Sequence, residues 1–222
     1  MSGGSPERPV VLIHGLWMPA AVMIPLARQL RRAGFTPYRF GYPSRQRTVA
    51  AHAEQLDAWL EERFTPGQPL GFVGHSLGGI VLRALAERRP EWFSRARTVQ
   101  LGTPNRGSAG AAFLAQWGPG RWWLGLAGGE LCANAGLPWP APPGEVAVLA
   151  GTRCRWWTRW LLDGPNDGLV AVSEACLPGA ELRTFPVGHT GMIFNRQVAE
   201  ATAHFLVEGR LDGHGEPAPP LC

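Results

Sequence analysis

A serine between two glycines is the first feature of the sequence that could do chemistry. Residues 74–78 read Gly-His-Ser-Leu-Gly and match the pattern G-x-S-x-G. This spacing fits a sharp turn from a strand into a helix, where side chains at both flanking glycine positions would clash. An apolar segment, residues 70–73, leads into the motif, and an amphipathic segment follows it. The motif therefore predicts that Ser76 is a nucleophile on a strand-to-helix turn.

The backbone near this serine is expected to supply an oxyanion hole. Attack on a carbonyl needs two N–H groups directed at the oxygen that becomes an anion. One candidate is the N–H of Leu77, directly after the serine, at the start of a helix. The other comes from the loop His-Gly-Leu-Trp that follows the first apolar run. We assign it to the N–H of Leu16, with that of Trp17 as the alternative, and expect His14 to shape the loop rather than act as a base.

Several segments of the chain carry a resemblance to a known family. Residues 11–15 (VLIHG), 74–79 (GHSLGG) and 101–108 (LGTPNRGS) resemble those of bacterial lipases and carboxylesterases of the α/β-hydrolase superfamily. Residues 166–170 (NDGLV) and the pair Gly188-His189 add to the likeness, which also extends to deacylases of inositol-linked lipids. Because these segments span most of the chain, the resemblance implies the α/β-hydrolase fold. It does not fix the substrate, since this fold hosts many chemistries.

The resemblance implies a catalytic triad in the chain order serine, acid, histidine. His189 follows a predicted strand and lies in the loop Val-Gly-His-Thr-Gly. It would take the proton of the serine hydroxyl and later give it to the leaving group. Three competing histidines are placed less suitably: His204 in the last predicted helix, His214 in the tail, and His52 ahead of the serine.

The acid of this triad is expected beyond the predicted strand at residues 146–149. Asp167, in the segment Asn-Asp-Gly-Leu-Val, is the first choice. Asp163, in Leu-Asp-Gly-Pro, remains an alternative, although aspartate in such a setting often forms a turn with its own backbone. Glu174 is a third candidate.

The elements that must position these residues alternate between strand and helix. Predicted strands cover residues 10–13, 35–42, 70–74, 98–101, 146–149 and 181–186, and predicted helices cover 20–33, 48–64, 77–89 and 197–206. Such alternation predicts an α/β protein with a mostly parallel central sheet and helices on both faces. We expect one domain over residues 1–208 and a loose Gly/Pro-rich tail over residues 209–222.

A stretch at residues 108–144 interrupts the alternation. We interpret it as a short cap-like excursion over the carboxyl edge of the sheet, too rich in Gly and Pro to pack as regular helix. Ser108 is expected to cap a following helix, and Thr103-Pro104 to be structural. The chain holds ten tryptophans, and the loop tryptophans either fill the core or line an apolar acyl-binding cleft. We assign four tryptophans to substrate binding: Trp17, Trp122, Trp123 and Trp157.

Composition excludes several other classes of protein. With 45% hydrophobic and 17% charged residues, the chain is neither disordered nor fibrous. Its net charge of +4 comes from arginines that form no dense run, so a nucleic-acid role is disfavoured. The absence of lysine is typical of a GC-rich bacterial genome. No metal or organic cofactor is implied.

The cysteines and the amino-terminal residues bear on the compartment. Cys132, Cys154, Cys176 and Cys222 form no C-x-x-C pair, which disfavours zinc. Two disulfides are the alternative to four free thiols. Because no signal peptide is recognised at the start of the sequence, free thiols are the simpler interpretation, and we expect a cytoplasmic protein.

These features favour a serine hydrolase that cleaves carboxylic esters with an apolar acyl or alcohol part. A thioesterase, lactonase or acyltransferase would use the same triad. A non-catalytic binding module on this scaffold is disfavoured, because no member of the triad is missing. The expected partner is a small-molecule or lipid ester, a transient contact with a membrane surface is compatible with the sequence, and the oligomeric state stays open.

Overall fold

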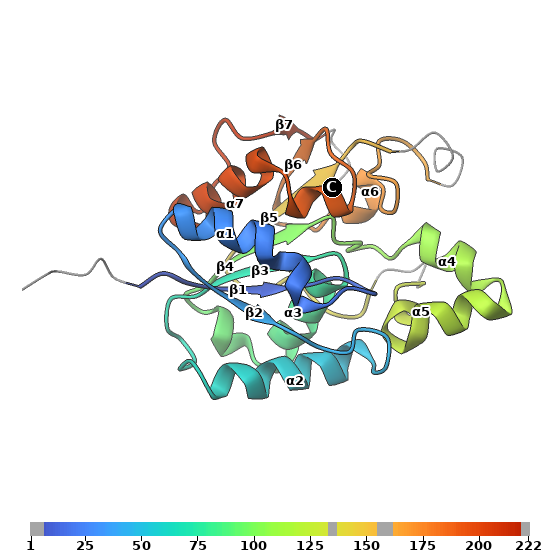
Figure 1. The fold of residues 1–222 in the computed structure, drawn as a ribbon, viewed down its shortest axis with the longest axis horizontal. Helices are drawn as coiled ribbons and strands as arrows, with labels where there is room; N and C mark the ends of the chain where they lie inside the picture. Colours follow the sequence, from blue (N-terminus) through green and yellow to red (C-terminus); the bar gives the residue numbers. More distant parts are fainter. Residues whose placement is uncertain (1–6, 133–136, 155–161, 219–222) are drawn as a thin grey trace, which may run out of the picture.

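The protein is built around one twisted sheet, seen in a computed structural model that describes residues 7–132, 137–154 and 162–218 (Figure 1). Within these residues the sheet has seven strands in the order β2-β1-β3-β4-β5-β6-β7. Neighbours from β2 to β6 pair in parallel, and β7 pairs antiparallel with β6. The strands are β1 (Pro9–Ile13), β2 (Thr36–Phe40), β3 (Gly71–His75), β4 (Arg97–Leu101), β5 (Glu145–Gly151), β6 (Glu181–Phe185) and β7 (Glu216–Pro217). The predicted fold class is therefore confirmed.

Helices cover both faces of the sheet (Figure 1). The first two α-helices after β1 and β2 are α1 (Ile24–Arg32), preceded by the short η1 (Ala20–Met23), and α2 (Val49–Glu61). The remaining helices are α3 (Leu77–Arg88), η2 (Pro90–Phe93), α4 (Ala109–Ala115), α5 (Gly118–Glu130), α6 (Val172–Ala175), η4 (Thr190–Ile193) and α7 (Arg196–Glu208). Helices α1 and α7 pack on one face, while α2 and α3 pack on the other. No helix among the described residues has the length and apolar character needed to cross a bilayer.

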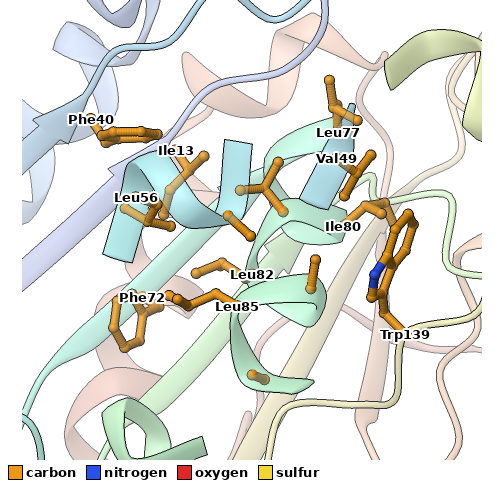
Figure 2. Close-up of a cluster of buried hydrophobic side chains, with 14 of the residues drawn as sticks. Ile13, Phe40, Val49, Leu56, Phe72, Leu77, Ile80, Leu82, Leu85 and Trp139 are labelled. Atoms are coloured by element: carbon orange, nitrogen blue, oxygen red, sulfur yellow. The ribbon is translucent and has the colours of Figure 1, made fainter. Parts of the chain in front are cut away.

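Successive side chains along the strands alternate between cores on the two faces of the sheet. In β1, Val11 and Ile13 join the cluster under α2 and α3, whereas Val10 and Leu12 join the cluster under α1 and α7. Such doubly covered strands read as continuous apolar runs, which is why the first strand was recognisable. Figure 2 shows part of the α2–α3 core, where Trp139 lies beside Ile80. This tryptophan of the excursion is therefore a core residue.

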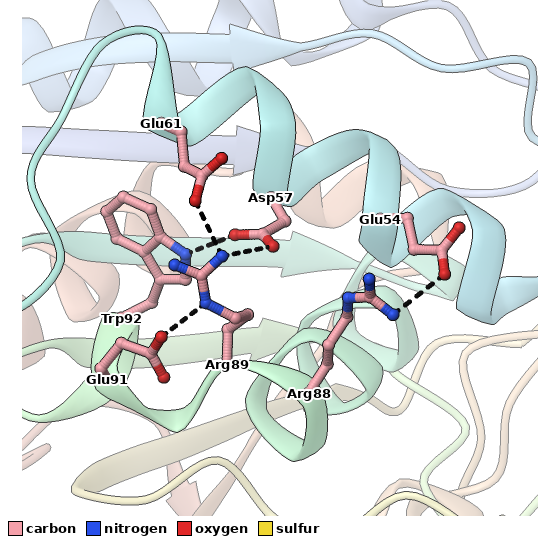
Figure 3. A network of polar contacts seen from close by, with 7 residues as sticks. All are labelled: Glu54, Asp57, Glu61, Arg88, Arg89, Glu91 and Trp92. Carbon is pink, nitrogen blue, oxygen red and sulfur yellow. Dashed lines mark hydrogen bonds and ion pairs between the residues drawn. The ribbon is translucent and has the colours of Figure 1, made fainter.

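A network of ion pairs and hydrogen bonds links α2 to the end of α3 and to η2 (Figure 3). Arg89 pairs with Asp57 and Glu61 of α2, each at 2.8 Å, and with Glu91. The indole N–H of Trp92 donates to Asp57 at 2.8 Å. Individual surface ion pairs contribute little to the free energy of unfolding. We therefore interpret this network as fixing the position of α2 relative to α3. Helix α3, which starts directly after Ser76, is thus anchored at its far end.

Residues 108–144 differ from the prediction, because α4 and α5 are helices. Ser108 caps α4 by accepting from Ala111 N at 3.1 Å, as predicted. Proline is tolerated in the first turn of α5, where its missing N–H has no helical partner. Among the glycines of α5, Gly125 has φ +67° and breaks the helix. A Cβ there would collide with the backbone of Arg45.

Two further expectations are corrected by the structure. The tail is not uniformly loose, because Glu216 of β7 pairs with Thr184 of β6 and adds a seventh strand. The expectation of free thiols holds for Cys132 and Cys154 but is wrong for Cys176, which is disulfide-bonded. The cysteine-based argument for a reducing compartment therefore does not apply to Cys176.

Candidate active site

Ser76 occupies a strained turn between β3 and α3. Its φ of 54° and ψ of −122° lie outside the regions that non-glycine residues usually adopt. Both flanking glycines are required as predicted: a Cβ on Gly74 would lie 2.5 Å from Gly79 N, and one on Gly78 would strike the carbonyl of Ile13. The backbone N–H of Ser76 donates to Leu101 O at 2.8 Å, which joins the turn to β4. Ser76 is half-buried and faces a cavity.

His189 and Asp167 form a buried pair at the same edge of the sheet. The distance from His189 Nδ1 to Asp167 Oδ2 is 2.7 Å, and the exposed fractions of the two side chains are 7% and 0%. The backbone adds a second link, because His189 N donates to Asp167 O at 3.0 Å. With Nδ1–H donating to the carboxylate, the imidazole presents Nε2 for proton transfer. Like Ser76, His189 lines the cavity.

The Asp167 carboxylate is held in place from its other side as well. Its Oδ1 accepts from Leu169 N at 3.0 Å and from Val170 N at 2.8 Å. A carboxylate that accepts backbone N–H bonds in a buried site has little freedom to rotate. The Asn-Asp-Gly-Leu-Val segment thus forms a tight turn whose amides fix the acid that faces His189.

The structure places the alternative acids and histidines elsewhere. Asp163 is exposed, and Glu174 accepts from Ala109 N at 2.6 Å and from Ala171 N at 2.8 Å, a capping role at two helix starts. Among the histidines, His204 of α7 lies against His214 with ring centroids 4.8 Å apart, and His52 is buried on α2.

Two glycines that the sequence analysis did not assign to the site are close to its reactive groups. A Cβ on Gly102 would lie 3.0 Å from Asp167 Oδ2 and 3.1 Å from His189 Nδ1. Gly102 also has φ +56°, which favours glycine. A Cβ on Gly15 would lie 3.0 Å from the Cβ of Ser76. Their signal in the sequence is a glycine within two residues of the end of a strand: Gly102 follows β4 directly, and Gly15 follows β1 after His14.

The amide groups proposed for an oxyanion hole flank the serine. Leu77 is the first residue of α3, and Leu16 directly follows Gly15, which lies against Ser76. The alternative donor, Trp17 N–H, already donates to Ser44 Oγ at 3.1 Å. This engagement favours Leu16 over Trp17.

Two histidines near the serine have structural surroundings. Burial, and then the charge of His189, lower the pKa of His75 to about 3, so this imidazole is neutral. Its Nε2 lies 3.1 Å from His189 O, which makes it a donor to that carbonyl. His14 stacks on Tyr42 with centroids 4.3 Å apart, and burial lowers its pKa. As predicted for His14, these groups shape the loops.

The cavity in front of Ser76 has a volume of about 710 Å³ and a largely apolar lining. Leu16, Phe113, Leu114 and Leu169 contribute aliphatic and aromatic walls. The predicted substrate-binding residues are placed differently from one another: Trp17 and Trp123 line this cavity, Trp122 lines a neighbouring one, and Trp157 lies outside the described residues. Over the described ranges, no cluster of three or more His, Cys, Asp or Glu side chains could hold a metal ion.

The sheet order and the strand-end placement of Ser76, Asp167 and His189 define an α/β-hydrolase fold. The model of the alpha/beta hydrolase family matches residues 10–202, so the chain belongs to this family.

Solved structures of bacterial and archaeal proteins share the fold. The lipase BlEst2 of Bacillus licheniformis in its mature form is 21% identical, with coverage of 92% of this chain and 94% of that chain, and a TM-score of 0.75. The monoacylglycerol lipase of Paleococcus ferrophilus is 21% identical over 93% of this chain and 97% of that chain, with a TM-score of 0.60. The carboxylesterase CesB of Bacillus subtilis is 16% identical over 94% and 86%, with a TM-score of 0.57.

Proposed function

We propose that the protein is a serine hydrolase of carboxylic esters, with Ser76 as nucleophile, His189 as base and Asp167 as the acid that orients it. The observation that carries this proposal is the 2.7 Å contact between His189 Nδ1 and Asp167 Oδ2 beside a cavity that Ser76 also lines. Membership of the alpha/beta hydrolase family and the fold shared with lipases and an esterase support an enzyme that hydrolyses esters.

The proposed reaction proceeds through an acyl-enzyme. His189 Nε2 takes the hydroxyl proton as Ser76 Oγ bonds to the ester carbonyl carbon. The N–H groups of Leu16 and Leu77 stabilise the oxygen that becomes negative. As the bond from the carbonyl carbon to the alcohol oxygen breaks, His189 passes its proton to the departing alcohol. A water molecule, deprotonated by His189, then attacks the acyl carbon. The bond from this carbon to Ser76 Oγ breaks, His189 returns the proton to Oγ, and the carboxylic acid is released.

The cavity favours an apolar acyl group of short to medium length. Its walls are mainly aliphatic and aromatic, and each methylene that they bury would contribute about 0.8 kcal/mol to binding. Trp17 and Trp123 close it on the side of α5, which limits the depth available to a chain. The names of the structural neighbours include a monoacylglycerol lipase and a carboxylesterase, which agrees with an apolar ester as substrate.

Labelling with a fluorophosphonate probe tests the nucleophile directly. We expect Ser76→Ala to abolish labelling and to lower ester hydrolysis by roughly 10⁴-fold, because the covalent step is lost. Ser94→Ala is the matched control, since Ser94 is exposed and its hydroxyl donates to Glu91 O. Labelling of Ser76→Ala at the wild-type rate would assign the nucleophile to another residue.

A substrate panel then separates ester hydrolysis from related chemistry. Esters, thioesters and lactones with the same acyl chain would be compared by kcat/KM. Labelled Ser76 together with turnover of thioesters or lactones but not of esters would replace the esterase assignment. No labelling at all would favour a non-catalytic binding module.

A further inference from the structure

A second cavity lies directly beside the one that contains Ser76. It has a volume of about 1110 Å³ and is bounded by α5 and by the loop after β2. Trp17, Met18 and Leu124 line both cavities, so the two share a wall. An ester bound at Ser76 has two parts, and the Ser76 cavity is suited to the apolar one. The adjoining space is therefore available to the other part.

One residue of the shared wall, Trp17, is held in a defined position by its contacts with Trp123 and Ser44. The rings of Trp17 and Trp123 stack with centroids 4.5 Å apart, and Trp17 Nε1 donates to Trp123 O at 2.8 Å. Trp17 has φ 61°, and its backbone N–H is held by Ser44 Oγ. A non-glycine residue at positive φ costs energy that surrounding contacts must offset. These contacts fix the indole on the oxyanion loop, between the two compartments.

The second cavity differs from the first in charge. Arg45 and Arg121 line it, and neither guanidinium forms an ion pair with a carboxylate in the described part of the chain. Arg45 lies over the ring of Trp122 at 5.1 Å and donates from Nη2 to Trp122 O at 2.9 Å. Within the described residues its Nε is buried without a hydrogen-bond partner, so these residues do not satisfy all of its donors.

One acidic side chain, Glu130, also lines this cavity. It accepts from Val49 N at 2.6 Å, which ties it to the start of α2. Burial raises the pKa of the Glu130 carboxyl. With two guanidinium groups and one carboxylate that is engaged by a helix start, the compartment favours an anion.

We propose that this second cavity binds the alcohol part of the substrate and recognises a phosphate or carboxylate group on it through Arg45 and Arg121. The inference rests on the proposed function, since the alcohol part is defined by the acyl transfer to Ser76. The acyl chain occupies the Ser76 cavity, and Trp17 separates it from the anionic group. The enzyme then prefers a single-chain ester of an anionic alcohol.

The chemical step is unchanged by this arrangement. Ser76 Oγ bonds to the acyl carbon, the bond from that carbon to the alcohol oxygen breaks, and His189 returns the proton to this oxygen. The alcohol leaves with its phosphate or carboxylate intact, and water later releases the fatty acid. Arg45 and Arg121 hold the anion throughout and exchange no proton, because guanidinium stays charged.

The experiment compares substrates that differ only in the alcohol part. Octanoyl esters of glycerol, glycerol 3-phosphate and glycerate would be assayed below their critical micelle concentrations. We expect kcat/KM to be about tenfold higher for at least one anionic ester than for the neutral one, mainly through a lower KM. This preference should shrink as NaCl is raised, since exposed charges are screened. The two anionic esters distinguish phosphate from carboxylate recognition, and inhibition by inorganic phosphate tests whether phosphate alone binds.

Charge variants test the assigned residues. The ratio of kcat/KM for the anionic ester to that for the neutral ester should fall about fivefold or more in Arg45→Gln and in Arg121→Gln. Glu130→Gln keeps an oxygen that can accept from Val49 N but removes the negative charge, so its ratio should rise about twofold. Arg32→Gln, on the exposed last turn of α1, is the control of equal charge change and should keep the wild-type ratio.

The outcomes separate this inference from the proposed function. Equal kcat/KM for neutral and anionic esters, or a ratio that falls as much in Arg32→Gln as in Arg45→Gln and Arg121→Gln, would overturn the anion site while ester hydrolysis stands. If the wild-type protein hydrolysed neither the neutral nor the anionic esters and its Ser76 were not labelled, the proposed function would be overturned instead.

Discussion

Two parts of the candidate site are built in different ways. We call the turns that carry Ser76, Asp167 and His189 the floor, and residues 108–144 the cover. On the floor, Asp167 and His189 are buried and each is held by several hydrogen bonds, whereas on the cover Trp122 and Trp123 are 75% and 50% exposed. The floor comes from tight turns at strand ends, and the cover comes from short helices broken at Gly125. The contrast suggests a division of labour: fixed geometry for the chemical step, and adaptable apolar surface for the choice of substrate.

Removing the orienting charge of the floor should have the largest effect. Asp167→Asn replaces the acceptor of His189 Nδ1–H with an amide and is expected to lower kcat by about 10⁴-fold. Asp163→Asn, at an exposed site four residues earlier, should remain close to wild type. Steady-state kinetics on a p-nitrophenyl ester would measure both, and the reverse ranking would transfer the role to Asp163.

A single methyl group on the floor should also be costly. In Gly102→Ala the new Cβ would approach both the Asp167 carboxylate and His189, at 3.0 and 3.1 Å. We expect kcat/KM to fall by roughly 100-fold and the free energy of unfolding to fall by about 1–2 kcal/mol, because φ at this site is also positive.

A matched control for this variant separates backbone strain from displacement of the proposed catalytic pair, Asp167 and His189. Gly34 has φ +88° with no heavy atom within 4 Å of an added Cβ. Gly34→Ala should therefore lose similar stability while keeping its activity. Equal activity in the two alanine variants would show that Gly102 does not position the pair.

The floor was largely predictable from sequence, whereas the cover was not. Ser76 and its glycines follow from local sterics, since only glycine fits where a Cβ would meet the backbone of the next helix. The first strand and helix α3 carry strong apolar patterns. The choice between Asp167 and Asp163 depends on which carboxylate reaches His189, a contact across 22 residues that no local pattern encodes.

Residues 108–144 show why the cover was predicted poorly. Its glycines and proline suggested irregular chain, but intrinsic propensity is weak against tertiary packing. Leu124 and Ala127 of α5 are buried in the α2–α3 core, and Glu174 caps the start of α4 from a distant segment. The sequence likewise does not show which of its tryptophans lie in the core and which line the cavity. Trp139 and Trp123 differ in their neighbours in the folded protein, which lie far away in the sequence.

The floor should also respond to pH through a buried histidine. The pKa of His75 is about 3 in the folded state and near 6.5 when the chain is unfolded. Between these values the unfolded state binds more protons, so the free energy of unfolding falls as pH decreases. From pH 7.5 to 5 this group should contribute a loss on the order of 2 kcal/mol.

His75→Gln should reduce this pH dependence, since the glutamine amide can still donate to His189 O and does not titrate. Urea denaturation at pH 7.5, 6 and 5 would measure the free energy of unfolding for both proteins. The same fall in wild type and variant would mean that His75 does not carry the effect.

A substitution in the cover is expected to change the rate least. It should instead change the preference for acyl-chain length. Wild-type kcat/KM on p-nitrophenyl esters should rise from acetate to about hexanoate or octanoate and then decline, because the Ser76 cavity has limited depth. Trp123→Ala removes the ring that stacks on Trp17, which lines both cavities, while Trp17 Nε1 keeps its acceptor, the backbone carbonyl of residue 123. The optimum should therefore shift to longer chains, with a change in kcat/KM of less than about threefold at the wild-type optimum.

Trp117→Ala is the matched control, because Trp117 is 63% exposed and lines neither cavity. A steady rise to palmitate in the wild type, with a jump above the micellar concentration, would contradict a cavity closed by Trp17 and Trp123 and would indicate a true lipase.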